Sequence, residues 1–414
     1  MTAPLASPKR KNPLLRTRLP TAPPARRSRV AQGLTSAAAL GVFALQRCED
    51  CGAVQYPPRE ACVKCLSARL RWRVVEGGGE LLSHTAIRLG QELYFRERAP
   101  WRVGLVRLDC GPSAIVALHG DCRPAPARVR LALALDKAGQ AMMIALPEKD
   151  TPDMADDPLI RETTSDPKFR KALITDAKTA VGRAMVEALL AAGADLVWAG
   201  YGEPWKPSPH LEHLRSLEQV SLVALDVTDE SSVRKLAGSI GGKVDIVVNT
   251  AEHHRANAIS SHQGVEAARA EMEVNYFGLL RLAQAFGPAL RARAADGETS
   301  ATAWVNILSV YALSSFPAHG TFSASKAAAL SLAQALRAEM QGCGIRVVNI
   351  FPGPIDDEWN QLILPPKLSA AALAASVVDA LKRGIEDVYP GDVAKDWLER
   401  LLDNPKALER ELAQ

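Results

Sequence analysis

Four cysteines in two closely spaced pairs restrict the fold of this chain more than any other feature. Cys48 and Cys51 form one C-x-x-C, and Cys62 and Cys65 form a second one after ten intervening residues. Each pair fits a tight turn that directs two thiolates to one point, so two turns complete a tetrahedral four-sulfur site. Zinc suits this ligand set, and its role is structural because four thiolates leave no open position for water. A disulfide pair or four unrelated core thiols are the competing interpretations.

The cysteine count and the N-terminus bear on the cellular compartment. The total of seven cysteines is odd, and no apolar stretch of a secretory signal follows the first basic residues, which favours a reducing compartment. No apolar run approaches the roughly 20 residues that span a bilayer. We therefore expect a cytoplasmic protein without membrane contact. Residues 1–30 hold eight basic side chains, six prolines and no acid, which predicts a disordered basic tail.

The residues after the cysteines predict a small all-β barrel. Short apolar runs alternate with turn residues, and no pattern of helical length intervenes. The runs are residues 81–87, 103–108, 113–118, 129–135 and 142–146. Residues 31–150 are therefore expected to form one domain, a zinc ribbon followed by a small all-β barrel, which the resemblance described next implies to be OB-like.

This domain resembles the OB-fold/zinc-ribbon family that accompanies thiolases and related acyl-CoA condensing enzymes. The resemblance covers about residues 31–147 and depends on the phrase LQRCEDCG and the following QYPPR. It implies an accessory module that binds a thiolase-like enzyme and helps to shape its acyl-CoA site. It identifies neither the acyl group nor the pathway.

Nucleic-acid binding is the alternative for this domain, because zinc ribbons, OB barrels and basic tails all occur in such proteins. The candidate stacking and phosphate-binding residues are Trp72, Tyr94, Phe95, Trp101, Arg96, Arg98 and Arg102. Aromatic residues of a barrel are more often part of its core, so nucleic acid is the less favoured partner.

Residues 151–169 are polar and proline-containing, which predicts a linker. Beyond it, short apolar strands alternate with helices of ten or more residues. This pattern predicts an α/β doubly wound domain with a parallel sheet over residues 170–414.

The second domain resembles the short-chain dehydrogenase/reductase family. The matching positions are Gly182 in the first turn, Asp226 on the adenine side, Asn249 at a strand end, Asn275 in EVNYFG, Ser309 in VNILS, Lys326 in FSASK and the phrase PGPI at 352–355. The resemblance implies a Rossmann fold, an NAD(P) site and a serine, a tyrosine and a lysine at the reacting centre.

The cofactor loop departs from the family. The family's first turn reads TGxxxGxG, whereas residues 175–182 read TDAKTAVG, so only Gly182 remains of three glycines. Those glycines let backbone amides approach the pyrophosphate at a helix N-terminus. Asp176 and Glu252 replace glycines by carboxylates, and Ala180 replaces the other glycine; Lys178 offers one compensating charge. NAD(P) binding is therefore doubtful.

The catalytic position departs as well. The family places a tyrosine four residues before the lysine and thirteen after the serine, which is Phe322 here. Phenylalanine keeps the ring but has no proton to transfer. Tyr311 is a conceivable substitute, although its position gives no reason for contact with Lys326. We expect Asn275, Ser309 and Lys326 to be structural remnants.

These observations favour a scaffold without dehydrogenase activity in an acyl-CoA-metabolising complex. The first domain would bind a thiolase-like partner. The second would associate with itself or with an active homologue through the helices predicted at 264–293 and 321–341. The competing hypothesis is an active NAD(P)-dependent oxidoreductase on a 3-hydroxyacyl-CoA-type substrate. The partner's identity and stoichiometry, and the role of the basic tail, do not follow from the sequence.

Overall fold

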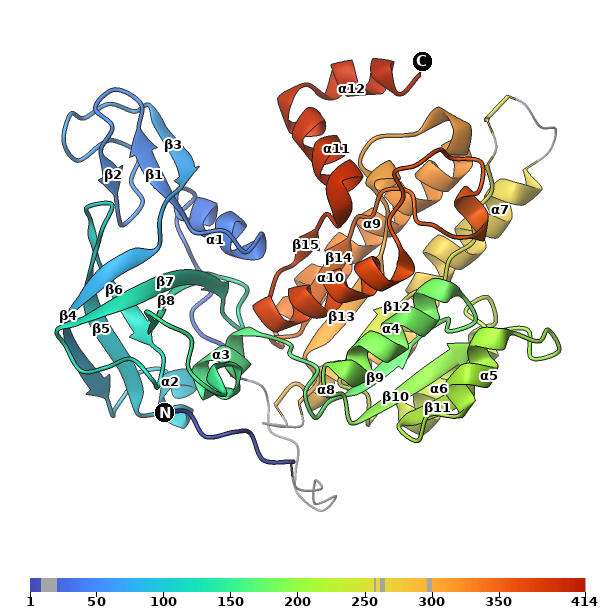
Figure 1. Cartoon of the computed structure of the whole chain (residues 1–414), viewed down its shortest axis with the longest axis horizontal. Coiled ribbons are helices and arrows are strands. Elements are labelled where there is room, and N and C mark those ends of the chain that lie inside the picture. Colours follow the sequence, from blue (N-terminus) through green and yellow to red (C-terminus); the bar gives the residue numbers. More distant parts are fainter. Residues whose placement is uncertain (9–20, 257, 261–264, 296–299, 414) are drawn as a thin grey trace.

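The computed structural model describes residues 1–8, 21–256, 258–260, 265–295 and 300–413 (Figure 1). A zinc ribbon and a barrel form the first domain, and a parallel sheet with helices on both faces forms the second, as predicted. The central part of the predicted basic tail, residues 9–20, lies outside the described residues. No described helix has the length and apolar character that crossing a bilayer requires.

The first domain contains two small β-structures. Strand β1 is the centre of an antiparallel sheet ordered β2-β1-β3, and the other five strands close a barrel ordered β4-β5-β6-β8-β7. Only β6 and β8 pair in parallel in that barrel. The elements are α1 (Gln32–Ala39), β1 (Ala44–Cys48), β2 (Val54–Gln55), β3 (Leu70–Val74), β4 (Gly78–Ile87), α2 (Leu93–Glu97), β5 (Trp101–Leu108), β6 (Ser113–Leu118), β7 (Ala127–Leu135) and β8 (Ala141–Pro147).

Helix α1 is part of the barrel core. Alternate residues of β7 point inward, as in a half-buried strand, and Leu34 and Ala38 of α1 pack in the same cluster as Leu131. A Cβ atom at Gly33 would lie 2.0 Å from the Trp72 side chain. Helix and ribbon therefore pack too closely for any larger residue at position 33.

The second domain is a seven-stranded parallel sheet ordered β11-β10-β9-β12-β13-β14-β15. Helices α4, α5 and α10 share one core cluster, and α6, α8 and α9 share the other, so the two sets cover opposite faces. The elements are β9 (Lys171–Ile174), α4 (Ala180–Ala191), β10 (Leu196–Tyr201), α5 (Pro209–Arg215), β11 (Val220–Ala224), α6 (Glu230–Ile240), β12 (Ile246–Asn249), α7 (Glu266–Met272), the π-helix η2 (Glu273–Gly278), α8 (Leu279–Arg293), β13 (Ala303–Ile307), η4 (Val310–Ala312), η5 (Pro317–His319), α9 (Gly320–Gln341), β14 (Arg346–Ile350), η6 (Glu358–Asn360), α10 (Ala370–Arg383), β15 (Asp387–Val388), α11 (Gly391–Asp403) and α12 (Pro405–Glu411).

The strand order fixes where a ligand site belongs. The first strand of the domain, β9, lies between β10 and β12, so the chain changes direction there. In open α/β sheets, ligands bind outside the carboxyl ends of the strands at this point.

The segment 151–169 connects the domains but has structure of its own. It contains η1 (Met154–Asp156) and α3 (Pro158–Thr163). The Asp157 carboxylate caps α3 through the Leu159 amide at 2.8 Å and also accepts from the Gly120 amide of the barrel at 2.8 Å. Farther along, the Ser165 amide donates to the carbonyl of Leu381 in α10 at 2.9 Å. The segment is thus anchored to both domains.

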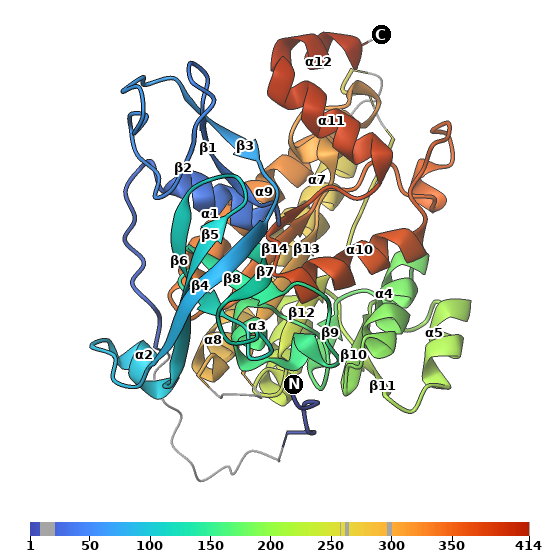
Figure 2. The same cartoon turned by 60° about the vertical axis from the view of Figure 1, so that its left-hand side comes forward.

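A buried arginine joins the domains directly. Arg346, at the start of β14, donates to the carbonyls of Leu135 at 3.1 Å and Thr163 at 3.0 Å. The Glu386 amide donates to the carbonyl of Ala39 in α1 at 2.9 Å. Figure 2 shows α1 and the barrel on the side of the second domain where α10 lies, and the Arg383 guanidinium at the end of α10 donates to the Gly41 carbonyl at 3.1 Å.

Candidate functional site

The four predicted ligand cysteines converge at the tip of the ribbon. Their sulfur atoms all lie within 4.8 Å of one another, and no other such group of potential ligands occurs in the described part of the chain. The Sγ atoms of Cys48 and Cys65 are 3.6 Å apart, and those of Cys51 and Cys62 are 3.5 Å apart. Zn–S bonds of about 2.3 Å in tetrahedral geometry place the sulfur atoms about 3.8 Å apart. The arrangement therefore fits structural zinc.

Backbone geometry prepares these thiols for a cation. Gly52, directly after the first cysteine pair, has a positive φ of 71°, which glycine adopts without strain. Hydrogen bonds from the backbone amides of Cys65 and Lys64 lower the pKa of Cys62 to about 6. A thiolate is the form that binds metal.

A second candidate site is a cleft of about 890 Å³ in the Rossmann domain. It is lined by the loops after β9, β10, β11 and β12 and by the segment around η6. These loops surround the point where the strand order reverses. The cleft is within the size range of small-molecule sites, and it lies where the resemblance places a dinucleotide.

The N-terminus of α4 is capped by the protein itself. The Thr179 hydroxyl accepts from the Gly182 amide at 3.0 Å, so one of the amides that would face a pyrophosphate already has a partner. A Cβ atom at Gly182 would lie 1.9 Å from the Asp176 carbonyl oxygen. Gly182 is therefore required for packing of α4 against the turn that follows β9, whether or not a phosphate binds.

Asp176 and Lys178 both line the cleft, but the lysine is turned toward its own fold. Lys178 Nζ donates to the carbonyls of Gly202 at 3.1 Å and Glu203 at 3.2 Å, and lies 3.6 Å from the Glu203 carboxylate. Burial raises the pKa of Asp176. The positive charge of Lys178, which the sequence offered as compensation for the carboxylates of the cofactor loop, is thus already partly neutralised.

Two further predicted cofactor residues have local partners. Asp226 lines the cleft and accepts from the amide and hydroxyl of Thr228 at 2.9 and 2.6 Å. Asn249 is buried behind the cleft wall, where its Oδ1 accepts from the Thr175 hydroxyl at 2.9 Å.

Phe322 occupies the position of the family tyrosine and is covered by an imidazole. Its side chain is 2% exposed, and the His254 ring stacks on it with centroids 3.6 Å apart and planes 14° apart. His254 Nε2 lies 2.5 Å from His319 Nδ1, and burial lowers the pKa of His254 to about 4. A neutral imidazole therefore fills the space over this ring.

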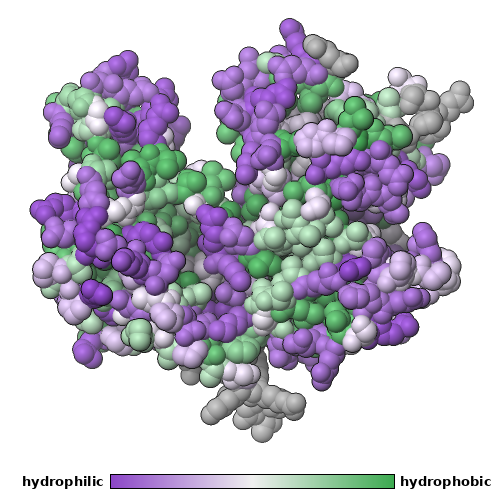
Figure 3. Space-filling model, in the orientation of Figure 1, coloured by the Kyte–Doolittle hydropathy of each residue, from purple (hydrophilic) through white to green (hydrophobic). Residues whose placement is uncertain are grey.

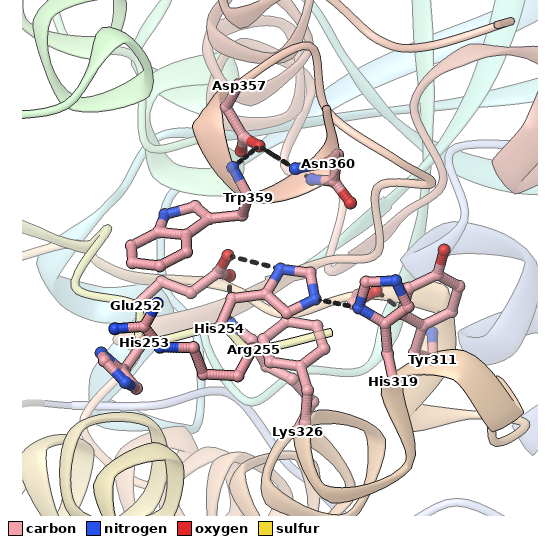
Figure 4. Close-up of polar contacts among 12 residues, drawn as sticks. Glu252, His253, His254, Arg255, Tyr311, His319, Lys326, Asp357, Trp359 and Asn360 are labelled. Carbon is pink, nitrogen blue, oxygen red and sulfur yellow. Dashed lines mark hydrogen bonds and ion pairs between the residues drawn. The ribbon is translucent and has the colours of Figure 1, made fainter. Parts of the chain in front are cut away.

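Lys326 is paired with the carboxylate that replaces a family glycine. Its Nζ lies 2.7 Å from Glu252 Oε2 and donates to the Ile307 carbonyl at 3.0 Å (Figure 4). Burial opposes ionisation of Glu252, but the nearby ammonium outweighs it and keeps the pKa of this carboxyl below its ordinary value. The lysine thus has an internal anionic partner.

Asn275 and Ser309 make structural contacts. The Asn275 side chain accepts from the amide of His253 at 3.0 Å and donates to its carbonyl at 2.9 Å. It lies in the π-helix η2, an irregularity frequent at functional sites. The Ser309 hydroxyl caps η4 through the Tyr311 amide at 3.2 Å.

Tyr311 packs among aromatic rings. Its ring stacks on Phe316 with centroids 5.0 Å apart and lies edge-on to Phe322 at 6.4 Å. Burial raises the pKa of its phenol, and Figure 4 shows the hydroxyl pointing away from Lys326. These contacts do not make it a substitute for the missing tyrosine.

The sequence interpretation missed several residues at the inner end of the cleft. His253, His254 and Arg255 directly follow Glu252, and the consecutive histidines were a visible signal. His319, Asp357 and Trp359 come from distant segments and carried no such signal. The His253 and Trp359 rings lie edge to face at 5.7 Å, and Asp357 caps η6 through the Trp359 amide at 3.0 Å.

Several of the residues considered for nucleic-acid binding contact other residues of the first domain. Tyr94, Phe95 and Trp101 form one aromatic cluster with centroids 5.1 to 6.3 Å apart. Arg98 lies 3.9 Å over the Tyr94 ring. Arg102 donates to the carbonyls of His119 and Gly120 at 3.0 and 2.7 Å. Tyr94 is buried, and Phe95 and Trp101 are half-buried, so the three rings pack on one another outside the main core cluster of the barrel.

Family comparisons match all three parts of the chain. Residues 35–71 match the ChsH2 rubredoxin-like zinc ribbon domain, residues 72–134 the ChsH2 C-terminal OB-fold domain, and residues 170–366 the short chain dehydrogenase family.

Similar proteins match the second domain. A short chain dehydrogenase from Burkholderia cenocepacia, solved in complex with NADP, is 33% identical with a TM-score of 0.54, covering 59% of this chain and 98% of that one. A Streptomyces avermitilis short-chain dehydrogenase is 26% identical with a TM-score of 0.51, covering 58% and 96%. An uncharacterized oxidoreductase of Staphylococcus aureus is 29% identical over 216 residues, 51% of this chain and 90% of that protein. The chain belongs to the short chain dehydrogenase family and carries this domain behind a ChsH2-type zinc ribbon and OB-fold domain.

Proposed function

We propose that this protein is a scaffold subunit without dehydrogenase activity in an acyl-CoA-metabolising complex. One observation carries the proposal: the protein's own side chains occupy both reacting positions. His254 covers Phe322 at 3.6 Å, and Glu252 pairs with Lys326 at 2.7 Å. A substrate oxygen would find no proton donor at position 322 and no space over that ring.

The zinc ribbon and barrel bind the partner, which we propose to be a thiolase-like enzyme with acyl-CoA bound at the complex. Exposed apolar side chains on the ribbon support this role. Val63 and Leu66 in the second knuckle are 58% and 80% exposed, and Val74 at the end of β3 is 73% exposed. Leu66 also has a positive φ of 60°, which is costly for a residue with a side chain. The Rossmann domain mediates association with a second copy or with an active homologue.

Purified protein with saturating NADP(H) or NAD(H) and a panel of 3-hydroxyacyl-CoA and 3-ketoacyl-CoA compounds tests the loss of hydride transfer. We expect no turnover above background. Turnover that Lys326→Ala abolishes would contradict the scaffold function.

Co-purification from the native host, analysed by mass spectrometry, tests the partner. We expect a thiolase-like protein with the full chain, and its loss with the double variant Val63→Asp and Leu66→Asp. Leu402→Asp, on α11 and 75% exposed, is the matched control and should keep the partner. Zinc content verifies that the ribbon of each variant is folded. Retention of the partner by the double variant would contradict docking on the ribbon.

An NAD(P)-dependent oxidoreductase is the second candidate, because the cleft is large and the Burkholderia relative was solved with NADP. Calorimetry with NADPH separates the candidates. Binding at micromolar concentration would favour this second function.

A further inference from the structure

One face of the ribbon sheet carries three arginines. Arg47 of β1 and Arg71 of β3 lie directly opposite each other in the antiparallel pairing of these strands, and Arg73 follows two residues after Arg71. Side chains of opposite residues, and of residues two apart on one strand, point to the same face of a sheet. All three side chains are exposed, and Figure 1 shows the ribbon at the free end of the first domain. The sheet therefore presents three guanidinium groups on one side.

Too little negative charge lies beside these arginines to neutralise them. Glu49 is shared, because its carboxylate lies 3.4 Å from Arg71 and 4.0 Å from Arg73. For Arg47, no side-chain hydrogen bond or ion pair occurs within the described part of the chain. Like charges directly opposite each other in a sheet are destabilising. The free protein thus contains an unfavourable pair of charges that an anionic surface would relieve.

The barrel shows a different arrangement of exposed arginines. Arg128 and Arg130 also lie two residues apart on one strand, β7, but each has a carboxylate of its own. Arg128 pairs with Asp109 at 2.6 Å, and Arg130 pairs with Asp150 at 2.6 Å. The shortage of acids on the ribbon face is therefore not a general property of this domain.

The arginine face fits an acidic protein surface better than a nucleic acid. Grooves for single-stranded nucleic acid combine positive charge with aromatic rings on which bases stack. Trp72 alternates with Arg71 and Arg73 along β3, so its ring points to the opposite face and packs closely against Gly33 of α1. Arginine pairs with carboxylates through two parallel hydrogen bonds, and it is enriched among the residues that contribute most to protein interfaces.

We propose that the face formed by Arg47, Arg71 and Arg73 docks on an acidic surface of the partner enzyme. Carboxylates of the partner pair with the guanidinium groups and oppose the repulsion between Arg47 and Arg71. This inference rests on the proposed function and deepens it, because it specifies the chemistry of the surface that meets the ribbon.

Two probes of opposite class test the face on the zinc-loaded full-length protein. One is a short glutamate-rich helical peptide, and the other is a single-stranded DNA with the same number of negative charges, both fluorescently labelled. At low salt, the double variant Arg47→Gln and Arg71→Gln should bind the peptide about fivefold more weakly, the loss expected for two exposed ion pairs. The basic residues before position 30 are the same in all proteins compared and contribute equally.

The matched control is the double variant Arg128→Gln and Arg130→Gln, which also removes two arginines from one face of the domain. Because those arginines are neutralised within the fold, it should change peptide affinity by about twofold or less. Zinc content and hydrogen exchange of the ribbon amides verify folding of both variants. The ribbon variant should fold, since it removes a repulsion.

Three outcomes would overturn the proposal. The ribbon variant could bind the peptide as tightly as the unmodified protein, or the barrel variant could lose as much affinity as the ribbon variant. A larger loss for DNA than for the peptide would identify nucleic acid as the ligand of this face.

Co-purification from the native host separates this inference from the proposed function. A thiolase-like protein should be retained by the full chain, lost with Arg47→Gln and Arg71→Gln, and eluted by salt, which screens exposed charges. Equal retention by the variant would refute the arginine face and leave the scaffold function intact. Retention of a different acidic protein, dependent on these arginines, would support the face and refute the partner named above.

Discussion

The zinc ribbon and the Rossmann cleft belong to one chain, yet their residues agree with the families they resemble to different degrees. In the ribbon, four sulfur atoms from two short turns converge with the spacing that zinc requires. In the cleft, the strand order and the wall loops are those of a dinucleotide site, while Glu252 and His254 occupy its reacting positions. A site made from two local turns is kept or lost as a unit. A site assembled from several loops can keep its shape while single residues change its chemistry. The two sites lie in different domains, which Figure 3 shows as separate lobes above their contact.

Loss of the zinc ligands should have the largest effect. The double variant Cys48→Ser and Cys62→Ser should unfold the ribbon sheet, because zinc binding contributes about 10–16 kcal/mol in isolated zinc-finger peptides. The unmodified protein should contain about one zinc per chain. Metal analysis and hydrogen exchange measure both outcomes, and Cys110→Ser, outside the cluster, should retain the metal. A protein that contains no zinc but whose ribbon amides are still protected from hydrogen exchange would contradict the proposed zinc site.

Repair of the cleft should be stepwise. Asp176→Gly, Ala180→Gly and Glu252→Gly together should restore NADP(H) binding, measurable by calorimetry, because carboxylates and a Cβ are removed and Lys326 is released.

Phe322→Tyr alone should leave turnover at background. Added to the repaired chain together with His254→Ala, which uncovers the ring, it should raise turnover by about 10²–10⁴-fold, the usual contribution of a positioned acid or base. A rise in turnover from Phe322→Tyr alone would show that the cofactor site was never impaired.

Gly182→Ala should destabilise the Rossmann domain by about 3 kcal/mol, because its Cβ would lie 1.9 Å from the Asp176 carbonyl oxygen. Urea denaturation measures this change. Gly238→Ala on α6 is the matched control, since a Cβ there meets no atom within 4 Å, and it should stabilise the protein by about 0.5–1 kcal/mol. A neutral Gly182→Ala would mean that the first turn can still rearrange around a phosphate.

The smallest expected effect is a dependence of stability on pH. The pKa of Asp357 is raised from 3.8 to about 6, mainly by burial and then by the charge of Glu252. The folded state therefore binds this proton more tightly than the unfolded state, and stability should rise as the pH falls from 7.5 to 5. The change should be about 1 kcal/mol or less after solvent screening. Thermal unfolding of Asp357→Asn should lack this increment; equal pH profiles for both proteins would contradict the assignment.

Much of the fold and of the candidate sites could be predicted from the sequence, because these features depend on the spacing of residues along the chain. The intervals between the cysteines predicted the cluster of four thiols that fits zinc, and the intervals from Ser309 and Lys326 placed Phe322 at the tyrosine position. Alternation of strands and helices predicted the parallel sheet. The residues that fill the site could not be found this way. His319 and Trp359 reach His254 only through tertiary packing, and their segments have no periodic pattern.

The segment 151–169 shows the same limit. Its prolines and aspartates are typical of an exposed linker, but Asp157 caps α3 and binds the barrel in the folded protein. The same composition serves a solvated linker and a capped helical turn, and only contacts with both domains distinguish them.

Arg346 determines how the two domains can cooperate. Its hydrogen bonds to Leu135 and Thr163 are buried, so rotation of one domain against the other would separate the buried guanidinium from the Leu135 carbonyl and leave it the Glu386 carboxylate of its own domain. A flexible tether would give a partner held on the ribbon an effective concentration of about millimolar at the cleft. With a fixed orientation of the two domains, the effective concentration at the cleft depends instead on geometry alone. The enzyme that we propose to dock on the ribbon would then be held at one distance and angle from the cleft, so its access to the cleft would depend on how the two domains pack.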